Sequence, residues 1–138
     1  MIVTAKIILG LILFFIGLRL FGGALKSLAN PTLLAVVDNP WAMALICFGV
    51  TLAVQSSSIT TALIVALTAS NHLSLAGAIG GIIGANVGTT VTAWIAAAVF
   101  GMETTARHAA IAHTFLNLTM AALALPFARQ IASLVSRL

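Results

Sequence analysis

A glutamine and five hydroxyl side chains lie within seven consecutive residues near the middle of this chain. These candidate binding residues are Gln55, Ser56, Ser57, Ser58, Thr60 and Thr61. A second polar stretch over 84–90 adds Asn86, Thr89 and Thr90. Apolar sequence flanks both stretches, and polar groups in such surroundings are costly unless they bind a ligand or one another. The two stretches therefore predict a desolvated binding site for ions or a small polar solute.

The residue types in the two stretches suit a cation and an anion together. Hydroxyl and amide groups both donate and accept hydrogen bonds, and neither stretch contains Asp, Glu, Lys or Arg. Where a helix is interrupted, unpaired N–H groups suit an anion and unpaired carbonyls suit a small hard cation. Co-transport of sodium with an anion would require such a site. The alternative is that these residues only form hydrogen bonds between helices, as Ser and Thr often do in membranes.

The composition is that of an integral membrane protein. Hydrophobic residues make up 62% of the chain and charged residues 6%, whereas a soluble domain has roughly 25% charged residues. At about 20 residues per helical span, the chain forms one membrane domain over residues 1–138. The basic residues are scattered near the ends of apolar segments, which suits interfacial anchoring and excludes a nucleic-acid surface. Cys47, the single cysteine, is predicted to be a buried small hydrophobe.

Hydropathy and turn residues divide the chain into segments. Membrane spans are predicted over 2–21 and 106–126, with an interfacial segment over 22–38 and a short amphipathic tail after residue 126. Asp38-Asn39-Pro40 marks a turn and a helix start, and Ser74 is a candidate N-cap.

The segment 41–70 has its polar residues in the middle. As one helix it would be roughly 45 Å long, against a hydrocarbon core of ~30 Å. Divided at the QSSS stretch, its arms cover 41–54 and 60–70, and each suits half a crossing. We therefore predict a re-entrant helical hairpin with a polar tip at the midplane. Irregular backbone at that depth must face protein or a water-filled cavity, so the tip is expected inside an assembly.

The segment 75–100 is predicted to be a broken span. Its glycines form three overlapping small-xxx-small pairs: Gly77/Gly81, Gly80/Gly84 and Gly84/Gly88. A glycine-rich interruption of a hydrophobic segment points to a discontinuous helix. The alternative is an unbroken helix with a tight packing face. The predicted fold is all-α, with about three transmembrane helices, one re-entrant hairpin and one broken helix.

The motifs QSSSITT, GANVGTTVTAW and AHTFLN, in that order, resemble the type II sodium-dependent phosphate cotransporter family. FFIGLRLFGGALKSL also resembles that family's first segment, and the resemblance covers roughly residues 10–127. It implies a membrane symporter for inorganic phosphate, with sodium as the coupling ion and no other cofactor. In that family the QSSS stretches lie on re-entrant hairpins and take part in sodium and phosphate binding. The nine candidate residues above are implicated, with sodium assigned to Gln55, Ser57, Ser58 and Thr89.

Family members carry two copies of this unit in inverted topology, with the site between them, whereas this sequence has one copy. It also lacks the soluble C-terminal domain that some bacterial relatives append. The chain is therefore expected to be half of an inverted-repeat transporter fold. Our hypothesis is an antiparallel homodimer whose QSSS tips meet at the midplane, since the basic residues divide two against four and permit dual insertion. The alternatives are a heterodimer with a separately encoded homologous half, or a fragment of a longer transporter.

Other functions are weighed on the same residues. A non-transporting subunit of a full transporter and a carrier of another oxyanion remain alternatives. A small cation exporter usually needs an intramembrane carboxylate, and both acids are predicted to lie in loops. A hydrolase would need a base near the serines, and neither G-x-S-x-G nor H-E-x-x-H occurs, so the chain is not expected to be an enzyme. The protein is expected to lie in the lipid bilayer of a prokaryotic inner membrane.

Overall fold

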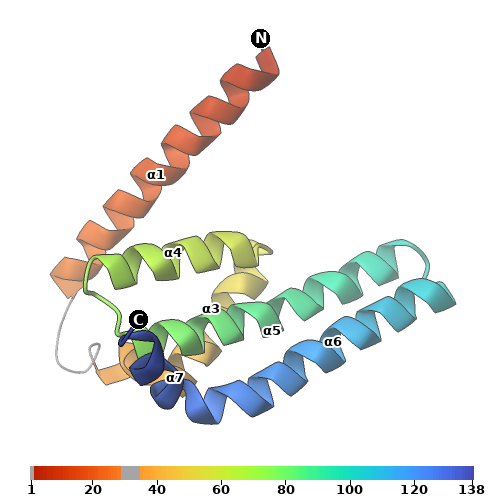
Figure 1. Ribbon diagram of the computed structural model, residues 1–138. Coiled ribbons are helices and arrows are strands. Elements are labelled where there is room, and N and C mark those ends of the chain that lie inside the picture. Colours follow the sequence, from red (N-terminus) through yellow and green to blue (C-terminus); the bar gives the residue numbers. More distant parts are fainter. Residues whose placement is uncertain (1, 29–34) are drawn as a thin grey trace.

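The computed structural model describes residues 2–28 and 35–138 (Figure 1). Every regular element in these ranges is a helix, which confirms the all-α prediction. The helices are α1 (Ile2–Leu28), α3 (Pro40–Val54), α4 (Ser57–Ala69), α5 (Leu75–Val99), α6 (Thr104–Ala124), a 3₁₀ turn at Leu125–Phe127 and α7 (Ala128–Val135).

α1 and the segment after it differ from their predicted boundaries. The helix does not end at residue 21 but continues to Leu28. Part of the predicted interfacial segment 22–38, namely 29–34, lies outside the described residues, and residues 35–37 are helical. Figure 1 shows α1 projecting away from the other helices, and its large apolar side chains, such as Val3 and Phe15, are exposed.

α3 and α4 form a helical hairpin whose turn consists of Gln55 and Ser56. α3 begins where predicted, because the Asn39 side chain accepts hydrogen bonds from the N–H groups of Trp41 and Ala42 and Pro40 occupies the first turn. After α4, Ser74 caps α5 by accepting from Gly77 N at 3.1 Å, as expected.

α5 is the central helix and it is continuous, so the prediction of a broken span over 75–100 is wrong. The glycines of α5 contact α3 instead of interrupting the helix. A methyl group at Gly80 would collide with the backbone of Pro40, one at Gly84 with Ala44, and one at Gly88 with Thr51 and the Phe48 carbonyl. The alternative of an unbroken helix with a tight packing face is therefore the correct one.

The order of these contacts gives the direction of packing. Gly80, Gly84 and Gly88 meet successively later residues of α3, so α3 and α5 run parallel. The hairpin turn then lies beside the second half of α5. α4 returns along α5 in the opposite direction, and Ile64 faces Gly81. The buried core of the three helices is formed by Met43, Cys47, Ile64, Leu73 and Ala78, which agrees with the prediction that Cys47 is a small buried hydrophobe.

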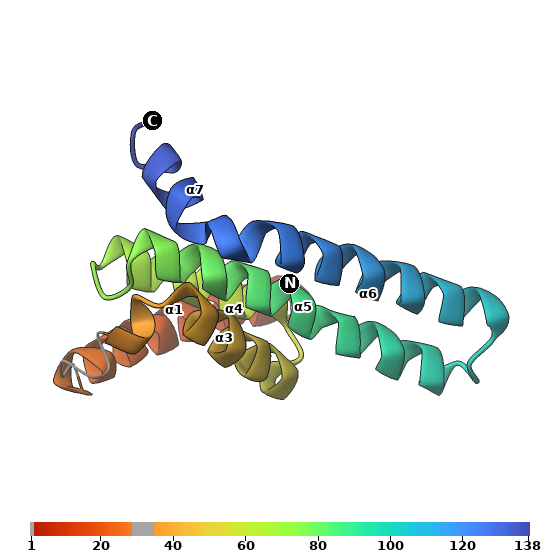
Figure 2. The same ribbon diagram turned by 90° about the horizontal axis from the view of Figure 1, so that it is seen from below.

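α6 packs antiparallel along α5, and the two form the long pair visible in both views (Figures 1 and 2). Trp94 of α5 donates its indole N–H to the Thr114 hydroxyl of α6 at 2.9 Å. Pro126 cannot continue an α-helix, and at this point α7 bends away from α6 (Figure 2). In the described residues, two helical stretches are long and apolar enough to cross a membrane: Leu75–Val99 and Thr104–Val135.

Candidate functional site

The hairpin turn brings the carbonyl end of α3 and the amide end of α4 to one place. Gln55 adopts the left-handed conformation (φ 55°, ψ 30°), and its N–H donates to Thr51 O at 2.7 Å to close α3. Ser56 is extended and caps α4, with its hydroxyl accepting from Ile59 N at 3.4 Å. Because only these two residues separate the helices, groups that suit a cation and groups that suit an anion lie side by side.

A buried pair of hydroxyls joins the two arms just behind this turn. Thr51 Oγ1 of α3 donates to Thr60 Oγ1 of α4 at 3.0 Å, and Thr60 in turn donates to Ser56 O at 3.2 Å. The two side chains are 0% and 1% exposed. Of these, sequence reasoning proposed Thr60 as a ligand and overlooked Thr51. The signal for Thr51 was its position, one helical turn before Gln55 in an otherwise apolar run.

Gln55 is also tied to α5. Thr92 Oγ1 donates to Gln55 Oε1 at 2.9 Å, and Gln55 Nε2 donates to Leu52 O at 2.6 Å. Thr92 belongs to the GANVGTTVTAW motif but was not among the predicted site residues. It follows Gly88 by four positions, so it lies on the same face of α5 that contacts α3.

The first turn of α4 presents the remaining groups of the QSSS stretch. Ser57 is half-buried and Ser58 is exposed, and Thr61 one turn later is half-buried. The N–H groups of Ser57 and Ser58 belong to the first turn of a helix, where no intrahelical acceptor exists. Such N–H groups, aided by the partial positive charge of the helix N-terminus, can bind an oxyanion. The serine hydroxyls can supplement this binding or donate their oxygens to a cation.

The second polar stretch does not converge on the hairpin turn as a unit. Thr89 Oγ1 donates to Ala85 O at 3.0 Å and Thr90 Oγ1 to Val87 O at 2.7 Å, so both hydroxyls bond within α5. Asn86 and Gly88 are about 200° apart around the helix, so Asn86 lies on the face away from α3. There it lines a cavity of about 110 Å³ together with Asn117 of α6.

The electrostatics around the turn come from helix ends and hydroxyls. The hydrogen-bonded residues of the turn include no acid or base, and the charged side chains lie elsewhere in the sequence. Within the residues that the structure describes, no group of three His, Cys, Asp or Glu side chains could hold a metal ion. Asn117 donates to His113 O at 2.8 Å within α6.

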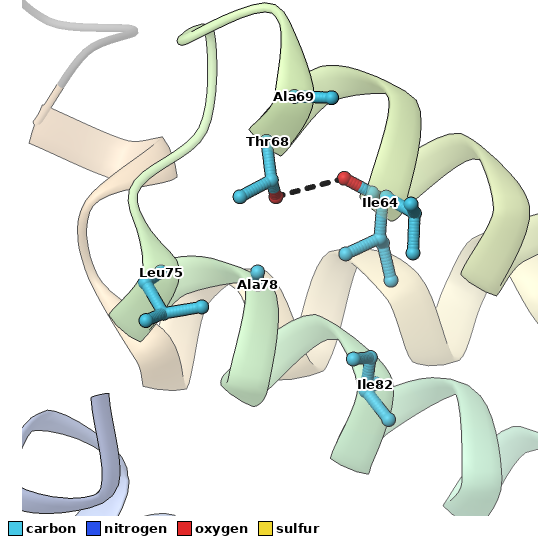
Figure 3. Close-up of a pocket in the computed structure, with 7 residues that line it drawn as sticks. Ile64, Thr68, Ala69, Leu75, Ala78 and Ile82 are labelled. Carbon is cyan, nitrogen blue, oxygen red and sulfur yellow. Dashed lines mark hydrogen bonds between the residues drawn. The ribbon is translucent and has the colours of Figure 1, made fainter. Parts of the chain in front are cut away.

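A separate cavity of about 340 Å³ lies between α4 and α5, nearer the other end of the hairpin (Figure 3). Its lining is apolar except for Thr68, whose hydroxyl donates to Ile64 O at 2.9 Å. A cavity of this kind offers no free polar group for an ion. The polar chemistry of the hairpin is therefore concentrated at the Gln55–Ser58 turn.

The comparisons with known proteins agree with these motifs. The sequence matches the family described as Na+/Pi-cotransporter over residues 6–136, nearly the whole chain. It is 32% identical over 127 residues to the uncharacterized protein YqeW of Bacillus subtilis (strain 168), an alignment that covers 90% of this chain and 41% of YqeW. The chain thus spans about two fifths of the length of that relative. No solved structure matches it.

Proposed function

This chain belongs to the Na+/Pi-cotransporter family, and from this premise we propose that it carries out sodium-coupled symport of inorganic phosphate. The family is one of transporters, which agrees with the expectation that the chain is not an enzyme. The observation that carries the proposal is the hairpin turn. It places the hydroxyls of Ser57 and Ser58, and their backbone N–H groups, at the start of α4 and close to the carbonyl end of α3. These first-turn N–H groups have no acceptor within the helix.

In this proposal phosphate binds at the first turn of α4. Backbone N–H groups at a helix N-terminus favour an anion, and the hydroxyls of Ser56, Ser57 and Ser58 are within the same turn. Sodium would bind through oxygens near the end of α3. Of the four residues assigned to sodium, Ser57 and Ser58 have no hydroxyl bond within the described residues, whereas Thr89 donates to Ala85 O and Gln55 is bonded at both ends of its amide.

We further propose that a second unit completes the site. Gln55 and Ser58 are exposed, and in a bilayer polar groups at the turn would be costly unless protein or a water-filled cavity covered them. A copy of this chain inserted in the opposite direction, or a homologous half, would bring a second hairpin to the same depth. The hairpin would then be re-entrant, in a prokaryotic inner membrane.

The test is uptake of radiolabelled phosphate into liposomes that contain only this purified chain, with and without an inward sodium gradient. The proposal predicts sodium-dependent uptake that Ser57→Ala reduces. Ser70→Ala is the matched control, because Ser70 lies at the opposite end of α4 and its hydroxyl bonds to Ala66 O. Phosphate uptake at the same rate with and without the sodium gradient would exclude sodium coupling. Absence of uptake from folded protein would instead favour a subunit that needs a separate partner.

The arrangement of the second unit is tested with a reporter fused to the C-terminus. An antiparallel homodimer requires that the reporter be active on both sides of the membrane. Activity on one side only would exclude that dimer and favour a homologous half of different sequence.

A further inference from the structure

Thr92 is the residue of α5 that bonds to the hairpin turn. Its hydroxyl donates to Gln55 Oε1 at 2.9 Å, between residues 37 positions apart in sequence. Within the residues that the structure describes, this is the one hydrogen bond between a side chain of the α3–α4 hairpin and a side chain of α5. The bond therefore ties the polar turn to the central helix at one defined point.

The rest of the contact between α3 and α5 has a different character. Glycines of α5 lie against α3: Gly80 and Gly84 against the backbone of Pro40 and Ala44, and Gly88 against the Thr51 side chain and the Phe48 carbonyl. Apolar side chains of α3 and α5, such as Met43, Cys47 and Ala78, fill the core beside them. Such packing brings the helices close but is non-directional, because dispersion attraction depends on the distance between atoms and not on the orientation of a particular group. One turn beyond Gly88, the same face of α5 carries the Thr92 hydroxyl in place of a glycine. The directional contact thus occurs where the hairpin turns.

Gln55 is held from three sides. Its N–H closes α3 on Thr51 O, its Nε2 donates to Leu52 O, and its Oε1 accepts from Thr92. Gln55 is also the residue whose left-handed conformation reverses the chain. An amide bonded at both ends is poorly placed to act as a primary ligand, but well placed to fix the turn.

We propose that Thr92 is a positioning residue: through Gln55 it fastens the α3–α4 turn to α5, and so holds the Ser57–Ser58 end of α4 in its binding position. The consequence for ligand affinity rests on the proposed function, whereas the consequence for the order of the turn does not. Loss of the bond leaves the glycine packing of α3 on α5 intact, so the helices stay folded while the turn opens more often.

The experiment compares four variants of the full chain with a fifth that serves as the control. Thr92→Val removes the hydroxyl with little change of volume, and Thr92→Ser restores it. Gln55→Ala and the double variant complete a cycle. Thr114→Val is the matched control, because it removes an interhelical bond of the same length, 2.9 Å, between α5 and α6. The first readout is hydrogen exchange of the backbone amides over 52–60, and the second is the half-saturating phosphate concentration for sodium-dependent uptake.

Hydrogen bonds between membrane helices average about a threefold effect on an equilibrium. We therefore expect Thr92→Val to speed exchange over 52–60 and to raise the half-saturating phosphate concentration, each about threefold. Thr92→Ser should resemble the wild type, and Thr114→Val should change neither the exchange rate nor the half-saturating concentration. The double variant should show no larger effect than Gln55→Ala alone, because that substitution already removes the partner of Thr92.

Unchanged exchange over 52–60 in Thr92→Val would overturn the proposal. So would a Gln55→Ala defect in phosphate affinity that far exceeds that of Thr92→Val and adds to it, because Gln55 would then bind the ligand itself. If the wild type shows no sodium-dependent uptake, the proposed function fails, and the exchange measurement still decides the role of Thr92.

Discussion

Gly84→Ala offers the sharpest test of how α3 and α5 are held together. Gly84 lies at the middle of their contact, with its α-carbon directed at the backbone of Ala44. A methyl group there would overlap the Ala44 carbonyl oxygen and lie 2.6 Å from the carbonyl carbon and 2.7 Å from Cα. Backbone atoms inside a helix cannot rotate away as the end of a side chain can, so the substitution must separate the two helices.

The structure sets the size of the effect. Carbon atoms in contact lie roughly 3.5–4.0 Å apart, so α3 has to move away by about 1 Å. A gap of that size forfeits about a quarter to a half of the attraction at each contact that it opens, and overpacking of this kind typically costs about 1–3 kcal/mol. Alanine in place of glycine also stabilises a helix by roughly 0.5–1 kcal/mol. This gain must be subtracted before the change in the free energy of unfolding can be assigned to packing.

Gly49→Ala supplies that correction. Gly49 lies in α3 itself, and apart from its own helix backbone no atom of the described residues lies within 4 Å of the position that a methyl group would occupy. Both variants gain the same helix propensity, so the difference between their free energies of unfolding isolates the packing effect. We expect Gly84→Ala to be about 1–3 kcal/mol less stable than Gly49→Ala in thermal or denaturant unfolding of the purified chain in detergent. Equal stability of the two variants would refute close backbone packing at Gly84.

Other predictions follow from the hairpin. Gly81→Ala should cost less than Gly84→Ala in the same unfolding assay, because its methyl group would meet the ends of the Cys47 and Ile64 side chains at 3.0 Å, and these ends can shift. Thr60→Val should destabilise the chain by about 1–3 kcal/mol, since it leaves the buried Thr51 hydroxyl without its acceptor. Thr51→Val should cost only about 0.5–1.5 kcal/mol, because Thr60 keeps its bond to Ser56 O; the reverse order would contradict the assigned bond directions. Ser57→Ala should lower phosphate binding, measured by equilibrium binding in sodium, with an unchanged unfolding midpoint, whereas Ser70→Ala should alter neither.

The hairpin was predictable because its signals are local. Asn39 and Pro40 determine where α3 begins, and the polar run at Gln55 shows where it ends, so the predicted arms over 41–54 and 60–70 lie close to the observed Pro40–Val54 and Ser57–Ala69. Ser56 and Ser74 are cap residues whose side chains bond three positions ahead. Each of these features depends on neighbours within one helical turn.

The continuity of α5 could not be settled by the same means. Glycines at spacings of three and four are compatible both with an interruption and with a face that another helix approaches closely. Only the position of Pro40, Ala44 and Thr51 against that face decides between them, and these residues lie about 40 positions earlier in the chain. The bond between Thr92 and Gln55 escaped prediction for the same reason, because a threonine among apolar residues does not identify its partner.

The face that each polar residue occupies also bears on what one unit can do alone. Thr92 and Gln55 bond to each other on the α3 side of α5, whereas Asn86 lines a cavity with Asn117 on the α6 side. The nine residues proposed as ligands therefore do not surround one point within a single chain.

Ser58 and Gln55 remain exposed on a molecule whose exterior is otherwise rich in large apolar side chains. If the turn lies within a bilayer, its exposed polar groups need protein or a water-filled cavity around them, and a second unit is the partner that we propose. YqeW is more than twice as long as the segment aligned here, which leaves room for such a unit in one polypeptide.

Joining two copies of this chain through a linker that permits opposite insertion would test directly whether two copies share one site. The fusion should show sodium-dependent phosphate uptake at least equal to that of the separate chains. An inactive, folded fusion would count against a site shared between two copies.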